Sequence, residues 1–240
     1  MVKEIPQEII KVYQRLTNAG FEAYLVGGCV RGLLMKHKVD DWDFASNAKP
    51  EEILKVFPNA FYENKFGTVG IPISSPVILG RSEATTPESP KKQEDSGQAR
   101  MTDKDIVEVT TYRKEGKYID RRRPENVTWG KTIEEDLARR DFTINAIALQ
   151  PAGLTDKTPR VIDPYNGKDD IKEGVIRAVG DPSARFQEDA LRLLRAIRQA
   201  TQLAFVIEEN TWQAIVSNGQ LITHISGERI REELLKILAS

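Results

Sequence analysis

Two short stretches near the N-terminus decide the fold of this 240-residue chain: LVGGCVRG at positions 25–32 and DDWDFAS at positions 40–46. The first begins in an apolar run, Ala23–Val26, that predicts a buried strand, and it continues into an expected helix from about Cys29 to Met35. The second lies in an alternating run, Val39–Ala45, that predicts another strand. A strand, a glycine turn, a helix and a second strand in so short a span predict a mixed α+β fold.

The glycine turn between the first strand and its helix has the composition of a phosphate site. Paired glycines let backbone N–H groups approach a phosphate closely, and a helix N-terminus favours its negative charge. Gly27 and Gly28 are therefore candidate phosphate ligands, with Arg31 on the first turn of the helix as a further donor. Paired glycines also make ordinary tight turns, so this alternative stays open at the level of the motif.

The second stretch places two carboxylates at strand spacing. Asp41 and Asp43 are two residues apart, so on a strand they project to the same face, where they repel each other unless a cation lies between them. Hard oxygen ligands suit Mg²⁺, and two such ions about 4 Å apart activate a hydroxyl and stabilise a leaving pyrophosphate. Glu108 lies in another alternating run, Ile106–Tyr112, and is a candidate third carboxylate. The alternative is a polar strand edge.

Composition narrows the class of protein. With 35 basic and 36 acidic residues the net charge is −1, which excludes non-specific coating of nucleic acid. No apolar run approaches the ~18–20 residues of a membrane span, and the first ten residues lack the apolar core of a signal peptide. Cys29 is the single cysteine, so an intrachain disulfide is excluded and a reduced cytosol is the expected compartment. Nothing indicates an obligate protein partner.

The chain divides near residue 174. Residues 1–173 mix predicted strands and helices, whereas residues 174–240 read as all-helical, with one long helix expected from Pro182 to Ala200. Residues 80–105 contain no Val, Ile, Leu or aromatic residue and are predicted to be a disordered insertion. Helices are also expected at 7–19, 50–56, 133–140, 208–217 and 226–238, and strands at 69–73, 144–149 and 161–163.

Two arginine-rich segments complete the set of candidate residues. The first segment is Arg139–Ala146, in which Arg140 and Asn145 are candidates for a triphosphate and ribose clamp. The alternative is that the arginines only stabilise the C-terminal end of a helix by interacting with its dipole. In the second, 188–198, Asp189 and Arg192 are three residues apart and are expected on one helical face. Such a pair can read the amine and ring nitrogen of cytosine or adenine; a plain salt bridge is the alternative. Nucleotide phosphates are the expected partners of two further arginines, Arg195 and Arg198.

In their order, these stretches resemble the class II tRNA nucleotidyltransferases, or CCA-adding enzymes, of the DNA polymerase β-like superfamily. The resemblance covers nearly the whole chain outside the insertion. It includes LVGGCVRG, DDWDFAS, KFGTVGI, VEVTTYR, EGKYIDRRRPE, EDLARRDFTINAIA, VGDPSARFQEDALRLLRAIR and SGERIREEL. The resemblance implies a mixed-sheet nucleotidyltransferase head (1–173) followed by a helical neck (174–240). Family members continue into body and tail domains.

The resemblance assigns roles residue by residue. Gly28 and Arg31 match the phosphate turn, and Asp41 and Asp43 match the ligands of Mg²⁺. The remaining matches are Glu108 in the catalytic sheet, Arg140 in the RRDF motif, Asp189 and Arg192 as the template for CTP or ATP, Arg195 and Arg198 as nucleotide contacts, and Gly116–Pro124 as a flexible loop. The family usually has Asp where this chain has Gly32.

The implied reaction is metal-dependent transfer of CMP and AMP from CTP and ATP to a tRNA 3′ end, releasing pyrophosphate. A poly(A) polymerase or a relative that adds only A or only CC is the alternative enzyme. The KFGTVGI string disfavours the polymerase, and the arginines at 121–123 disfavour the CC-only enzyme. A non-catalytic RNA-binding remnant is the alternative of another class.

Overall fold

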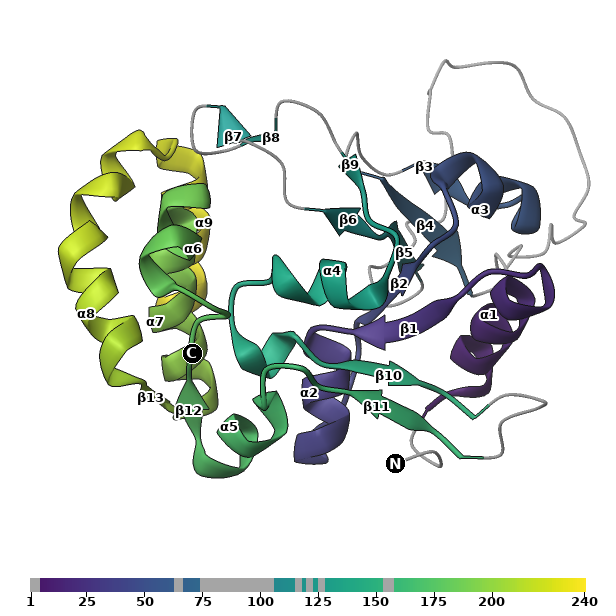
Figure 1. Ribbon diagram of the computed structural model, residues 1–240, viewed down its shortest axis with the longest axis horizontal. Coiled ribbons are helices and arrows are strands. Elements are labelled where there is room, and N and C mark those ends of the chain that lie inside the picture. The colour runs from purple at the N-terminus through teal and green to yellow at the C-terminus, as the bar shows by residue number, and fades with distance from the viewer. Residues whose placement is uncertain are drawn as a thin grey trace, which may run out of the picture.

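The computed structural model describes residues 5–62, 67–73, 106–114, 118–119, 123–124, 128–152 and 158–240. The predicted insertion at 80–105 and part of the 116–124 loop lie outside these residues. The described chain forms one large sheet with helices around it, and a group of helices on one side of the sheet (Figure 1).

The large sheet is mixed. Most neighbouring strands run antiparallel, but β2 and β5 run parallel to each other. Across the sheet the order is β11 (Arg160–Ile162), β10 (Ala148–Gln150), β1 (Ala23–Val26), β2 (Trp42–Ser46), β5 (Ile106–Thr111), β4 (Thr68–Pro72) and β3 (Phe61–Tyr62). The parallel pair sets Asp43 opposite Glu108 at one register position.

The helices of the first part follow local sequence signals. They are α1 (Gln7–Asn18), α2 (Gly28–Met35), α3 (Pro50–Val56), α4 (Ile133–Ala138) and α5 (Gly167–Glu173). Pro50 occupies the first turn of α3, and the Glu52 carboxylate accepts the Lys49 N–H at 2.7 Å, which satisfies a donor left open at the helix start. Thr132 caps α4 by accepting the Glu135 N–H at 3.4 Å.

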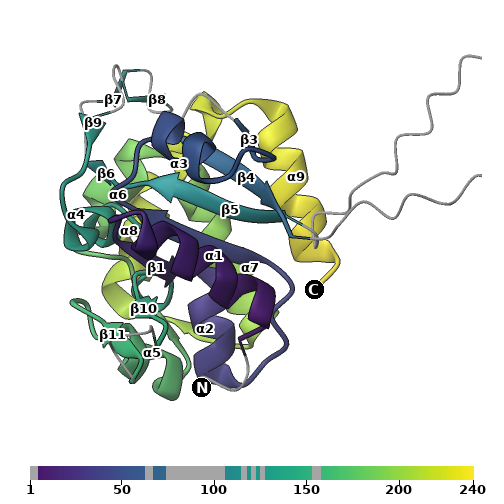
Figure 2. The same cartoon turned by 90° about the vertical axis from the view of Figure 1, so that its right-hand side faces the viewer.

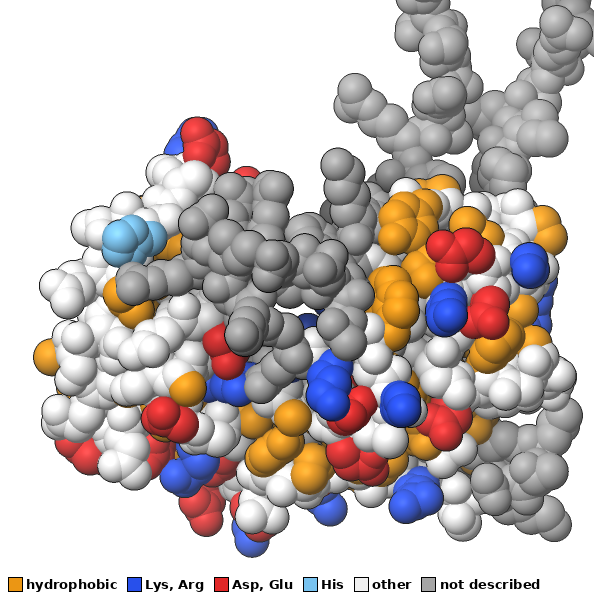
Figure 3. Space-filling view, turned by 45° about the horizontal axis from the view of Figure 1, so that its top comes forward, with side chains coloured by type: hydrophobic (Ala, Val, Ile, Leu, Met, Phe, Trp, Pro, Cys, Tyr) orange, Lys and Arg blue, Asp and Glu red, His pale blue; other side chains and the backbone are white. Residues whose placement is uncertain are grey.

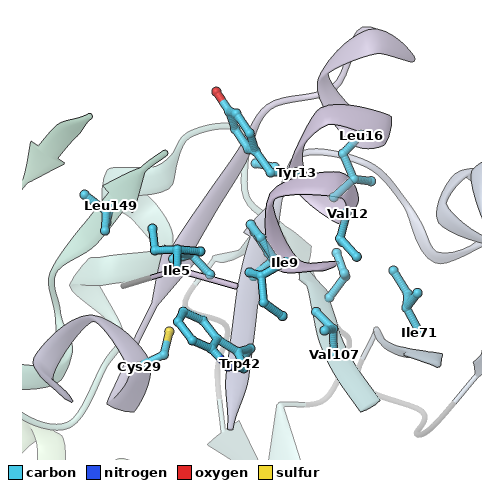
Figure 4. Packing of buried hydrophobic residues seen from close by; sticks show 14 of the residues in the cluster. Ile5, Ile9, Val12, Tyr13, Leu16, Cys29, Trp42, Ile71, Val107 and Leu149 are labelled. Carbon is cyan, nitrogen blue, oxygen red and sulfur yellow. The ribbon is translucent and has the colours of Figure 1, made fainter. Parts of the chain in front are cut away.

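The main core lies between α1 and one face of the sheet. Ile9, Val12 and Leu16 of α1 point towards Trp42 and Val107 of the central strands, as the close view shows (Figure 4). Each fully buried aliphatic side chain contributes about 2 kcal/mol by leaving water. The i, i+3, i+4, i+7 spacing on α1 thus explains how the helix covers the sheet; Figure 2 shows it from the side.

Residues 174–240, called the neck below, are mainly helical and contribute most of a second buried hydrophobic cluster. It contains α6 (Pro182–Glu188), α7 (Leu191–Leu203), α8 (Glu209–Asn218), the 3₁₀ helix η4 (Gly219–His224) and α9 (Gly227–Leu238). Two short strands, β12 (Val175–Ile176) and β13 (Val206–Ile207), pair in parallel. Phe142 and Ile144 of the preceding part pack into this second cluster, so the two parts are continuous.

Two smaller strand pairs are separate from the large sheet. β6 (Arg113–Lys114) pairs with β9 (Thr128–Trp129), and β7 (Tyr118–Ile119) pairs with β8 (Arg123–Pro124). The second pair falls within the segment that was expected to be a flexible loop. No helix in the described part of the chain is long and apolar enough to cross a membrane.

Three expected elements differ from the structure. The strand expected at 39–45 begins only at Trp42, so Asp41 precedes it. The strand expected at 144–149 is a 3₁₀ helix, η3 (Thr143–Asn145), followed by β10, because the Asn145 N–H bonds to the carbonyl of Phe142. The long helix expected from Pro182 is two helices, α6 and α7, which are separated at Asp189 and Ala190.

Candidate functional site

The glycine turn lies against a carboxylate and an arginine. Gly27 has φ +73°, and a Cβ placed there would lie 3.2 Å from Nη1 of Arg140 and 3.6 Å from Oδ2 of Asp43. Glycine is therefore required both for the backbone conformation and for the close approach of the two side chains. Gly28 is the first residue of α2. The structure thus brings the turn, Asp43 and Arg140 together.

Asp43 and Glu108 both line a cavity of about 390 Å³. Neighbouring strands lie about 4.8 Å apart, and side chains at one register position point to the same face. Val107 and Val109 on either side of Glu108 are fully buried on the opposite face, as the alternating sequence predicts. The cavity is also lined by Arg140 and, from the neck, by Asp189, Arg192, Arg195 and Arg229.

Asp41 lies at a second cavity of about 320 Å³. This cavity is lined by Gly28 and Arg31 of α2 together with Asp41 and Asp43. Asp41 is exposed and precedes the strand, whereas Asp43 is half-buried within it. Asp43 therefore lines both cavities and connects the phosphate turn to the neck residues.

The carboxylates fit a divalent cation that is shared with a phosphate ligand. Among the described residues, no three His, Cys, Asp or Glu side chains cluster tightly enough to hold a metal by themselves. Mg²⁺ is commonly held by one or two carboxylates, with phosphate and water oxygens completing its octahedron. Asp41 and Asp43 supply such a pair, with Glu108 beside Asp43.

At Gly32, where the resemblance implies Asp, α2 lacks a side chain. A Cβ at this position would lie 2.8 Å from a methyl group of Val39. The His37 N–H donates to the Gly32 carbonyl at 2.9 Å at the end of α2. The absence of a side chain therefore lets the segment after α2, which carries Asp41, pack closely against the helix.

Arg140 is held by a buried carboxylate. Its Nη2 lies 2.9 Å from Asp136 Oδ2, and Nη2 of Arg139 lies 2.6 Å from the other oxygen of Asp136. Burial alone would raise the pKa of Asp136, but the charges of Arg140 and Arg139 outweigh it and hold that pKa well below its usual range. The two arginines of the RRDF motif are thus fixed from behind.

Asp189 and Arg192 do not share a helical face, contrary to the prediction. Asp189 has extended dihedrals (φ −145°, ψ 104°), and its Oδ1 accepts the Leu191 N–H at 3.1 Å. A short aspartate side chain that bonds the backbone two residues ahead competes with helix formation, so the helix stops and restarts here. The alternative, a plain salt bridge between Asp189 and Arg192, is not formed either, since each side chain has another partner.

Those partners come from different elements. Arg229 of α9 donates to both oxygens of Asp189, at 2.8 and 3.3 Å. Arg192 donates to Glu188 at 2.6 Å and to the carbonyl of Arg139 at 2.9 Å. Both side chains still line the larger cavity. Arg229 was not among the candidates, although the SGERIREEL string contains it; no charge pattern local to the string marks it.

Asn145 and Arg195 meet at a buried carboxylate, Asp141. Arg195 donates to one oxygen of Asp141 through Nε and Nη2, at 2.9 and 2.6 Å, and Asn145 Nδ2 donates to the other at 3.1 Å. Burial raises the pKa of Asp141, but Arg195 and these hydrogen bonds lower it to about 2. The negative charge of Asp141 in turn raises the pKa of Arg195. Asp141 belongs to the segment 139–146 that was expected to form the triphosphate and ribose clamp, but its bonds to Arg195 were not predicted.

Arg198 lies away from the larger cavity. Its Nε donates to Glu233 of α9 at 2.6 Å, and its Nη1 donates to Gln202 at 2.9 Å. Glu233 is only 4% exposed, so this pair ties α7 to α9 inside the neck. Among the predicted residues that line neither cavity are Gly27, Asn145 and Arg198.

Basic and acidic side chains lie next to one another on the face shown in Figure 3, rather than gathering into one basic patch. The mixed charges on this face agree with the net charge of −1.

A protein-family model matches the part of the chain that contains most of the residues of this site. The family model of the poly A polymerase head domain matches residues 23–100 and 82–177. The chain belongs to the poly A polymerase head-domain family. A second model, described as a probable RNA and SrmB-binding site of polymerase A, matches residues 204–240. The head-domain match includes the glycine turn, both aspartates, Glu108 and the RRDF motif.

The chain is also similar to curated CCA-adding enzymes. The chain is 41% identical to that of Lactobacillus helveticus over 239 residues, and 39% identical to that of Geobacillus stearothermophilus over 233 residues. These alignments cover 98% and 97% of this chain, and 51% and 49% of the relatives. The chain therefore spans about half the length of the curated relatives that it matches.

Solved structures of CCA-adding enzymes have folds similar to that of this chain. The Bacillus stearothermophilus CCA-adding enzyme in complex with CTP matches with a TM-score of 0.74 and 35% identity, over 97% of this chain and 48% of the other. The Thermotoga maritima CCA-adding enzyme complexed with tRNA-CCA matches with a TM-score of 0.71 and 26% identity, over 99% and 48%. These matches confirm the expected fold class.

Proposed function

We propose that this chain carries the nucleotide-transfer site of a CCA-adding enzyme, which moves CMP and AMP from CTP and ATP to the 3′ end of tRNA. The observation that carries the proposal is the position of Asp43. It lines the cavity that contains the phosphate turn and also the cavity that contains Asp189 and Arg192. A nucleoside triphosphate has a phosphate end and a base end, and it needs both kinds of surface at once.

The residues divide the work by chemistry. The start of α2 and Arg31 bind the triphosphate, whose negative charge suits a helix N-terminus and a guanidinium. The cavity wall formed by Asp189 and Arg192 offers an acceptor and donors to the edge of the base. Arg140, fixed by Asp136, holds the sugar or phosphate near Asp43. Arg195 lies on the same wall of the cavity.

A divalent cation, Mg²⁺ in the simplest case, would be held by Asp41 and Asp43, with Glu108 beside them. It would supply charge neutralisation for the reacting phosphates. The carboxylates of this chain orient the terminal hydroxyl of the RNA and receive its proton, directly or through water. The hydroxyl oxygen bonds to the α-phosphorus of the nucleotide while the bond from that phosphorus to the pyrophosphate oxygen breaks, and pyrophosphate leaves towards Arg31 and the glycine turn.

The domain boundary near residue 174 and the function of the 116–124 loop remain proposals. We propose a head at 1–173 and a neck at 174–240, with the base-reading wall contributed by the neck. The loop would favour addition of the terminal A. A cytosolic location, without a membrane or an obligate protein partner, completes the proposal.

The deciding experiment is an incorporation assay with the 240-residue chain, radiolabelled CTP or ATP, and tRNA lacking its 3′ end. Addition of C to the shortest substrate and of A to the substrate ending in CC is the expected result. Addition of A alone to any RNA would favour the alternative poly(A) polymerase. Binding of RNA without incorporation, at saturating nucleotide and Mg²⁺, would favour the non-catalytic RNA-binding protein.

A further inference from the structure

Gln199 is a buried polar side chain that no assigned role explains. It lies on α7 of the neck and is only 4% exposed. Burying an amide is unfavourable unless it is hydrogen-bonded, and glutamine is usually found at protein surfaces. Hydrogen bonds of this side chain must therefore offset the cost of its burial.

The side chain of Gln199 links the neck to the phosphate-binding part of the molecule. Its Oε1 accepts from Nδ2 of Asn145 at 3.0 Å and from Nη1 of Arg31 at 3.4 Å. Nη1 of Arg31 also donates to Oδ1 of Asn145. Three elements thus meet at one guanidinium: α2, which packs against β1 and β2, the 3₁₀ helix η3, and α7.

The partners of Arg31 are neutral. Within the described ranges, the guanidinium of Arg31 is hydrogen-bonded to two amide oxygens and has no carboxylate within salt-bridge distance. Desolvation lowers the pKa of Arg31, and the positive charges of Arg198 and Arg195 act in the same direction. The negative charge of Asp141 raises the pKa of Arg31, but Asp141 is itself bound by two hydrogen bonds from Arg195. Arg31 is therefore ordered without being neutralised.

We propose that Gln199 is a positioning residue that fixes Arg31 through a neutral amide, so that the full guanidinium charge stays available for a triphosphate. The inference rests on the proposed function, because it takes a nucleoside triphosphate as the ligand of Arg31. An amide supplies the acceptor geometry of a carboxylate but not its charge. A carboxylate in the same place would hold the arginine more firmly and compete with the phosphate for it.

Two substitutions separate charge from packing. Gln199→Glu keeps the size and the acceptor oxygen but adds a negative charge beside Arg31. Gln199→Met keeps the volume, removes the acceptor and leaves Arg31 charged. The matched control is Gln213→Glu, the same change at an exposed position on α8 of the neck.

The measurements are the dissociation constants of CTP, ATP and inorganic tripolyphosphate, together with the melting temperature. For Gln199→Glu we expect about tenfold weaker binding of all three ligands, the size of effect when one charge-assisted phosphate contact is lost, with a melting temperature equal to or above wild type. Gln199→Met should bind two- to fourfold more weakly and melt lower. Gln213→Glu should match wild type.

A positioning role predicts opposite orders for the two variants: Gln199→Glu binds the ligands more weakly than Gln199→Met but has the higher melting temperature. If affinity simply follows melting temperature, so that Met is the weaker binder of the two, Gln199 is a packing residue and the proposal is wrong. If the Glu variant does not fold, unchanged CTP binding by the folded Met variant overturns the proposal. Failure of the wild-type chain to bind CTP and tripolyphosphate would instead overturn the proposed function.

Discussion

The two sides of the larger cavity are built differently. On the sheet side, Asp43 and Glu108 are placed by the parallel pairing of β2 and β5, so the backbone fixes their relative position. On the neck side, Asp189 and Arg192 are placed by ion pairs and hydrogen bonds to Arg229, Glu188 and the carbonyl of Arg139. Substitutions on the sheet side should therefore remove chemistry and leave the shape, whereas those on the other side should change shape and selectivity.

The largest effect is expected at Asp43. Asp43→Asn keeps the strand but removes one negative charge where a metal and phosphates would meet, a loss of several kcal/mol in the transition state. Incorporation of both CMP and AMP should fall by at least about a thousandfold. The circular dichroism spectrum should not change. Asp40→Asn is the control, since Asp40 is an exposed neighbour paired with Lys38, and an equal loss there would contradict the special role of Asp43.

The next largest effect is expected at Asp136, which fixes Arg139 and Arg140. Asp136→Ala leaves two arginines without their buried partner, and breaking such a pair costs about 3–5 kcal/mol. Urea denaturation should show this loss, and nucleotide binding should weaken with it. The control is Glu134→Ala, an exposed position on the same helix. Equal stability of the two variants would show that the arginines are held by other contacts.

Acid should weaken another buried pair, the one between Asp141 and Arg195. The pKa of Asp141 is about 2 in the folded chain, and that of an unfolded aspartate is about 3.9. The unfolded state therefore binds protons first as the pH falls. The stabilisation from Asp141 is fully present above about pH 5 and is lost between about pH 4 and pH 2, and it amounts to about 2 kcal/mol. Denaturant midpoints from pH 7 to pH 3 test this; a loss complete by pH 5 would contradict it.

A smaller and more selective effect is expected at Asp189. Asp189→Asn keeps the acceptor oxygen but loses the charge that Arg229 holds in place. The preference for CTP over UTP should fall roughly 10- to 100-fold, the equivalent of one charged hydrogen bond. The total incorporation rate with CTP should change less than this. An unchanged ratio would mean that Asp189 is only the partner of Arg229.

The smallest effect is expected at Lys38. Its amine lies 2.9 Å from Asp40, and the two side chains are 80% and 44% exposed. Exposed ion pairs contribute under about 1 kcal/mol, so Lys38→Ala should barely change the denaturant midpoint. A large shift would show that the segment after α2 depends on this pair as well as on the contact between Gly32 and Val39.

The sequence by itself predicted the elements whose signals are local. Pro50 and Glu52 mark the start of α3, the alternating valines around Glu108 mark β5, and the apolar spacing on α1 marks its buried face. These signals act between residues a few positions apart, so they predict an element without knowledge of how the rest of the chain folds. The resemblance of the motifs in their order also gave the family, which the comparisons confirm.

Only the tertiary structure decided how the site is held. The ion pair of Asp189 with Arg229, the bond of Arg195 to Asp141 and the contact of Gln199 with Arg31 join residues 40, 54 and 168 positions apart. A charged side chain has several partners within reach along the chain, and the choice among them depends on which element the fold brings near. The spacing in the sequence favoured a pair of Asp189 with Arg192. In the structure α9 packs against α7 and brings Arg229 to Asp189 instead. A carboxylate pairs with the guanidinium whose position allows two good hydrogen bonds, and this need not be the nearest one in sequence.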